Sequence, residues 1–131
     1  MLLSVGYFLT CALLLASVQC YHEFISHIPS GDSVTHPCEP SQPWHGVGHY
    51  NPQGGGHLNP FGHDFQAVGR QWTQELCWHD SDGDGLTNGF ELGDPYCQWH
   101  QGVQPTWTGN VTHPGIHNVE GCFPRARQAV H

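Results

Sequence analysis

Basic residues are nearly absent from this sequence. Lysine and arginine together number 3 among 131 residues, and the formal net charge is −8 with the histidines neutral. Proteins that bind nucleic acid or anionic membrane surfaces do so through clustered lysines and arginines. The scarcity of basic side chains therefore argues against nucleic acid and against a membrane as partners.

Long hydrophobic runs are also lacking beyond the start of the chain. Residues 1–20 contain an apolar stretch, Phe8 to Ala16, that ends in Ser17-Val18-Gln19-Cys20. Such a stretch is typical of a secretory signal peptide and is too short to serve as a membrane anchor. We expect cleavage before Tyr21 and a secreted, extracellular protein with a single domain over residues 21–131.

The mature chain is short, so burial alone gives a domain of this size little stability. Six cysteines are present, and Cys11 and Cys20 would leave with the signal peptide. The cysteines that stay with the domain are Cys38, Cys77, Cys97 and Cys122. In an oxidising compartment they predict two disulfides, although their number alone does not select the pairing.

Turn-forming residues are abundant, with 17 glycines and 10 prolines. This composition favours a small, loop-rich α+β fold with few long elements. Phe65, Val68, Trp72 and Leu76 recur at helical spacing, which predicts one short helix over about residues 64–78 with Asp64 as its N-cap. β-Branched and aromatic residues between positions 98 and 118 predict one or two short strands.

The segment from Asp80 to Glu91 matches a twelve-residue EF-hand calcium loop. Carboxylates at positions one, three and five point at the ion, a glycine at position six permits a sharp turn, and a glutamate at position twelve closes the shell. We expect one structural Ca²⁺. The ligands that the pattern predicts are Asp80, Asp82, Asp84, Leu86, Asn88 and Glu91.

This loop differs from that of a calcium sensor. Thr87 stands at position eight, where a paired EF-hand carries an aliphatic residue, and the sequence has no second loop. Gly93-Asp94-Pro95 stops any following helix within about one turn. Cys77 and Cys97 flank the loop, so we predict that they pair and leave Cys38 to pair with Cys122.

Histidines offer a second candidate metal site, for copper or zinc. His45, His49, His57 and His63 lie close together in a glycine-rich region, and His113 could join them. None of them lies on a convincing helix face, so polar loop histidines are the alternative interpretation.

Signatures of catalysis are weak. The sequence contains neither a nucleophile elbow nor a His-Glu-x-x-His motif, and disulfides would consume the thiols. We therefore expect no enzymatic activity.

Asn110-Val111-Thr112 is an acceptor triplet for N-glycosylation, which would make the protein a glycoprotein.

Several motifs together are similar to those of a known family. They are Gly46-Val47-Gly48-His49, the glycine run 54–56 followed by Asn59-Pro60-Phe61-Gly62, Trp72-Thr73 with Leu76-Cys77, the block 80–99 and Thr112-His113-Pro114-Gly115. Over roughly residues 44–115 the chain resembles the temptin family, secreted molluscan proteins of water-borne pheromone complexes.

The resemblance implies a two-disulfide signalling protein that binds other secreted pheromone proteins or peptides and promotes attraction or mating. Two alternatives stay open from the residues: a calcium-binding glycoprotein of an extracellular or shell matrix, and a copper enzyme with histidine ligands. Metal content and the location of the protein after secretion distinguish the three hypotheses.

Overall fold

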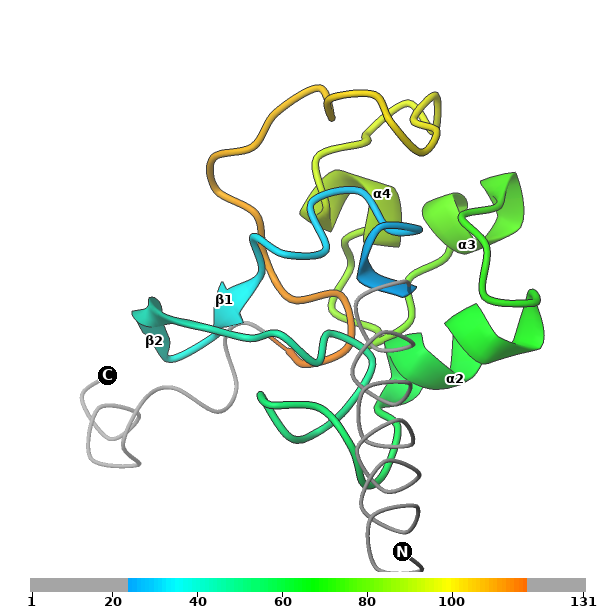
Figure 1. Cartoon of the computed structure of the whole chain (residues 1–131). Helices are drawn as coiled ribbons and strands as arrows, with labels where there is room; N and C mark the ends of the chain where they lie inside the picture. The colour runs from blue at the N-terminus through cyan, green and yellow to red at the C-terminus, as the bar shows by residue number, and fades with distance from the viewer. Residues whose placement is uncertain (1–23, 118–131) are drawn as a thin grey trace, which may run out of the picture.

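The computed structural model describes residues 24–117, in which short elements are joined by long loops (Figure 1). In chain order the elements are β1 (Thr35–His36), β2 (Glu39–Pro43), α2 (Pro60–Ala67), α3 (Gln74–Trp78) and α4 (Asn88–Glu91). The two strands form an antiparallel hairpin on one side of the molecule, and the helices lie on the other. The expectation of a small, loop-rich fold with short elements is confirmed.

One hydrophobic core joins the loops to the helices. Its buried members are Ile28, Val34, Trp44, Val47, Phe61, Phe65, Leu76 and Leu92. They come from the segment before β1, the loop after β2, the helices α2 and α3, and the residue that follows α4, so no single element could bury its apolar side alone. Burial of these side chains is the main favourable contribution to a fold with so little regular structure.

The single helix predicted over 64–78 is wrong, because the chain breaks between α2 and α3. Gly69 and Arg70 both take left-handed backbone conformations, with φ of 79° and 58°. The Arg70 N–H donates to the Phe65 carbonyl at 2.9 Å, which is the long hydrogen bond of a Schellman motif at a helix C-terminus. The helical spacing of hydrophobic residues continues across this turn, so the sequence pattern does not indicate the break.

The caps set where the two helices begin. Asn59, and not Asp64, caps α2, since its side chain accepts a hydrogen bond from the Gly62 N–H at 2.9 Å. Pro60 follows at the first helical position, where its missing N–H costs nothing. Thr73 caps α3 in the same way through the Leu76 N–H.

The start of α2 packs directly against the loop at residues 46–49. The Asn59 N–H donates to the Gly48 carbonyl at 2.9 Å, and its side-chain amide donates to the Val47 carbonyl at 2.8 Å. A Cβ at Gly62 would overlap the Gly48 backbone, so only glycine allows the two segments to come this close. The Asn-Pro-Phe-Gly motif thus both starts α2 and packs it against the loop at residues 46–49.

The strands predicted between positions 98 and 118 do not form in the described part of that segment. Gly102 and Asn110 turn the backbone there, with φ of 91° and 57°. The strands lie instead at residues 35–43, a segment that reads as turns because of its prolines. Every residue of β2 is exposed, and Pro40 and Pro43 fit an edge strand whose free side needs no N–H donors.

No helix in the described range 24–117 has the length and apolar character needed to cross a membrane.

Candidate metal centre

The acidic loop lies between two short helices and is closed at its base. α3 ends at Trp78 and α4 begins at Asn88, and the Asn88 N–H donates to the His79 carbonyl at 2.7 Å. Thr87 caps α4 by accepting from the Phe90 N–H at 3.1 Å. α4 ends within one turn, and Gly93 follows with φ of 85°, as the Gly-Asp-Pro sequence predicted.

The first carboxylates of the loop converge on one point. Oxygens of Asp80, Asp82 and Asp84 lie within 4.8 Å of one another. Backbone N–H groups hold Asp80 in place: Gly83 donates to its Oδ1 at 2.9 Å, and Gly85 donates to its Oδ2 at 2.8 Å. The loop folds around its own acidic side chains, so the cluster is a product of local backbone geometry.

Asp82 carries the electrostatic cost of this arrangement. Burial, followed by the charge of Asp84, raises the pKa of the Asp82 carboxyl to about 7. Its Oδ2 is buried and has no hydrogen-bond partner among the described residues. A divalent cation between the three carboxylates would neutralise the repulsion and provide a partner for this oxygen, so these residues fit a calcium ion.

Asn88, predicted as a ligand, is fully buried and bonded to the protein. Its side-chain N–H groups donate to the Leu76 carbonyl and to the Ser81 hydroxyl, each at 2.8 Å. Its Oδ1 accepts from the Ser81 N–H at 3.3 Å. The amide therefore links α3 to the start of the loop, and its role as a calcium ligand stays a prediction.

The remaining predicted ligands are Glu91, at the end of the segment, and Leu86, in its middle. Glu91 is 1% exposed and accepts a hydrogen bond at Oε1 from the Thr112 hydroxyl at 3.2 Å, and it is not part of the group formed by the three aspartates. The Leu86 N–H donates to Asp84 Oδ1 at 3.0 Å. One contact was not predicted: the His117 ring is hydrogen-bonded to the Asp82 carbonyl.

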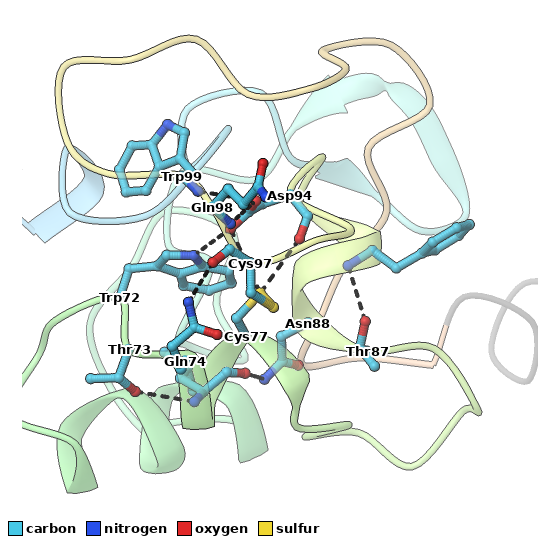
Figure 2. The surroundings of a disulfide bond; sticks show 12 residues. Trp72, Thr73, Gln74, Cys77, Thr87, Asn88, Asp94, Cys97, Gln98 and Trp99 are labelled. Carbon is cyan, nitrogen blue, oxygen red and sulfur yellow. Dashed lines mark hydrogen bonds between the residues drawn. A yellow bond between two sulfur atoms is a disulfide. The ribbon is translucent and has the colours of Figure 1, made fainter.

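The predicted disulfide between Cys77 and Cys97 is confirmed (Figure 2). The S–S distance is 1.97 Å and the Cα atoms lie 5.7 Å apart. The bond joins α3, which precedes the acidic loop, to the turn that follows α4. The second predicted bond, from Cys38 to Cys122, is untested because Cys122 lies outside the described residues.

Asp94 is a buried carboxylate that sequence reasoning missed. It is 2% exposed and lies beside the disulfide in Figure 2. Oδ1 accepts from the backbone N–H groups of Gln98 and Trp99 at 2.9 and 3.1 Å, and Oδ2 accepts from the Trp72 indole at 2.9 Å. These bonds fix the turn that carries Cys97, so Asp94 is a structural residue.

The histidines do not gather in the described part of the chain. No group of three potential metal ligands there includes a histidine. His45 and His57 are exposed and His49 is half-buried. A second metal at these residues stays an untested proposal, and the structure adds no support for it.

His113 belongs to the core. It is fully buried, its Nδ1 accepts from the Gly115 N–H at 3.0 Å, and its ring meets the Trp44 ring edge-on at 4.7 Å. Burial, with a smaller effect of His36, lowers the pKa of His113 to about 3. The ring is therefore neutral at physiological pH and serves packing.

Asn110, the candidate glycosylation site, is exposed on a turn. Among residues 24–117 its side chain is exposed, so this part of the chain leaves the position accessible to a transferase. Attachment of a glycan stays a prediction.

The fold and this site define a small, loop-rich domain in which a disulfide joins the two flanks of an acidic loop. A family model described as temptin C-terminal matches residues 18–116. Temptin of Aplysia californica is 55% identical over 109 residues, which is 83% of this chain and 87% of that protein. The chain therefore belongs to the temptin family. No solved structure matches it significantly.

Proposed function

We propose that this protein is a secreted calcium-binding component of a water-borne pheromone complex, in which it binds other secreted pheromone proteins or peptides. Membership of the temptin family supports the biological role. Two observations support calcium binding, and the proposal depends most on the first: carboxylate oxygens of Asp80, Asp82 and Asp84 converge, and Asp82 Oδ2 is buried without a hydrogen-bond partner among the described residues.

Calcium in this proposal is structural. The loop is closed at its base by the hydrogen bond between Asn88 and His79, and a disulfide joins its flanks. The ion would order residues 80–86 without swinging a long helix, since α4 has only four residues. Extracellular sites of this kind bind calcium with Kd of about 10⁻⁴ to 10⁻³ M.

Calcium binding is tested by titration calorimetry and thermal unfolding of the mature protein. The double variant D82N/D84N should lose binding, whereas D32N removes one exposed carboxylate far from the loop in sequence and should bind normally. With Kd of about 10⁻⁴ M, about 10 mM calcium should stabilise the folded state by about 2.7 kcal/mol. Equal stabilisation of wild type and D82N/D84N would refute the site.

An aromatic pair formed by exposed Phe90 and half-buried Trp107 offers a surface for the partner. Phe90, in α4, is 47% exposed and meets the Trp107 ring edge-on at 5.2 Å. Aromatic side chains are frequent hot spots of protein interfaces. Because Phe90 lies within the calcium loop's span, ordering of the loop would also set its position.

The biological role is tested by locating the protein after secretion. We expect it in conditioned water, co-purifying in calcium with a secreted peptide or protein, and F90S should weaken that association without loss of folding. Tyr96, which is 69% exposed, provides the control Y96S. Recovery from demineralised matrix alone would favour the matrix glycoprotein, and one stoichiometric copper would favour the copper enzyme.

A further inference from the structure

A separate apolar pocket of about 240 Å³ lies on α2, away from the acidic loop. Its walls come from the segment 24–28, the loop 45–49 and one face of α2. The apolar lining residues include Ile25, Ile28, Val47, Leu58, Phe61 and Phe65, together with the Phe24 ring. Gly48 and Gly62, whose backbones approach each other closely, are both part of the lining. The glycines that let α2 pack against the loop at residues 46–49 therefore also shape this pocket.

The pocket is bordered by Arg70, the single lysine or arginine among residues 24–117. The Schellman turn after α2 fixes its backbone, with the Arg70 N–H bonded to the Phe65 carbonyl. The guanidinium carbon lies 5.6 Å from the centre of the Phe24 ring, which is itself part of the wall. The one lysine or arginine of residues 24–117 therefore lies at the border of an apolar pocket.

His49 also lines the pocket. Its Nδ1 is buried and has no hydrogen-bond partner among the described residues. Because this nitrogen is shielded even from water, a ligand would reach it only after the ring moves. The pocket thus combines an apolar wall with one cation.

We propose that this pocket binds a small apolar carboxylate, an aromatic or short aliphatic acid of about ten non-hydrogen atoms. The volume lies between that of a cavity of about 150 Å³ that takes benzene and the 300–1,000 Å³ or so of drug-sized sites. In a protein with net charge −8, Arg70 is the one lysine or arginine of the described range, so it is the permanent positive charge with which an anion can pair there. The carboxylate pairs with Arg70, and the apolar body fills the space between Val47 and Phe65.

The test compares phenylacetate with phenylacetamide, which has nearly the same shape and no charge. Binding to the mature calcium-loaded protein is followed by NMR at pH of about 8, and Arg70 is the one lysine or arginine of the described range that can face the ligand. We expect phenylacetate to bind with Kd of about 1 mM and to shift resonances of Val47, Leu58 and Phe65. The amide should bind about five- to tenfold more weakly.

Substitutions of Arg70 supply the decisive comparison. R70Q keeps a residue of similar backbone preference at this left-handed position, so it should fold, and it should bind the acid and the amide equally. R70K keeps the charge and should restore most of the preference for the acid. D82N/D84N should bind phenylacetate as wild type does, because the pocket is separate from the proposed calcium site.

Three results would overturn the proposal. The first is equal affinity of the two probes for the wild type, and the second is a set of resonance shifts confined to the acidic loop. The third is no binding of either probe at about 10 mM, and that result would favour a partner's side chain as the occupant of the pocket. None of these results bears on calcium binding by the loop, so the two proposals can fail independently.

Discussion

Replacement of Asn88 by alanine distinguishes a structural role of this side chain from a role as a calcium ligand. The variant removes two 2.8 Å hydrogen bonds, to the Leu76 carbonyl and to the Ser81 hydroxyl, from a position with 0% exposure. A buried polar group left without a partner costs about 1–3 kcal/mol, and the small cavity adds to that. We expect N88A to lose about 3 kcal/mol of unfolding free energy in the absence of calcium.

The assay is urea unfolding in EDTA and again in saturating calcium. If Asn88 acts through Leu76 and Ser81 alone, the loss is the same in both conditions. The control N51A removes an exposed asparagine whose side chain accepts one hydrogen bond, from the Gln53 N–H at 3.0 Å, and should cost under about 1 kcal/mol. Unchanged stability of N88A in EDTA together with weaker calcium binding would refute this reasoning and make Asn88 a ligand.

The remaining predictions concern the disulfide, a glycine and a histidine. C77A/C97A opens a bridge with a sequence separation of 20 and should lose about 3 kcal/mol in chemical unfolding; full stability would show that the bridge is dispensable. G89A places a Cβ against Cys77 Sγ and should cost about 1–3 kcal/mol, whereas G109A meets open space and should not. The pKa of His113 falls from 6.5 to about 3 on folding, so unfolding takes up a proton: stability is complete above pH 6.5 and falls as pH approaches 3. Between pH 7.5 and 5 this contributes a loss of about 2 kcal/mol, which H113N should lack in unfolding measured across that range.

The disulfide could be predicted because two independent features point to it. Cys77 and Cys97 flank a motif whose ends must meet for its carboxylates to converge, and the pairing follows from that geometry. The end of α4 was also predictable, since Gly93 and Pro95 act locally through the backbone. Features that depend on one short stretch of chain are the ones that the sequence predicts well.

The helix break and the strands could not be predicted because they depend on competing interactions. Phe65, Val68, Trp72 and Leu76 keep helical spacing across the left-handed turn at Gly69 and Arg70, so the pattern describes a buried side and not a continuous helix. The β hairpin contains prolines that weaken any strand signal.

Buried polar residues escaped sequence reasoning for a different reason. Asp94, His113 and Asn88 resemble ordinary polar loop residues until tertiary contacts show what surrounds them. Each is at most 2% exposed. Asp94 and Asn88 form several hydrogen bonds to the backbone, and in a chain with few strands and short helices such bonds replace the ladders that regular structure would supply.

The same bonds limit which residues would change structure if an ion bound in the acidic loop. The base of the loop is held by the Asn88 amide, the Asn88–His79 backbone bond and the disulfide, none of which requires a cation. We predict that the structural effect of calcium is confined to residues 80–86 and to α4, which contains Phe90. Loss of a bound calcium should then loosen the surface around Phe90 while the core and the α2 pocket persist, so an ion bound there should affect partner contact more than folding.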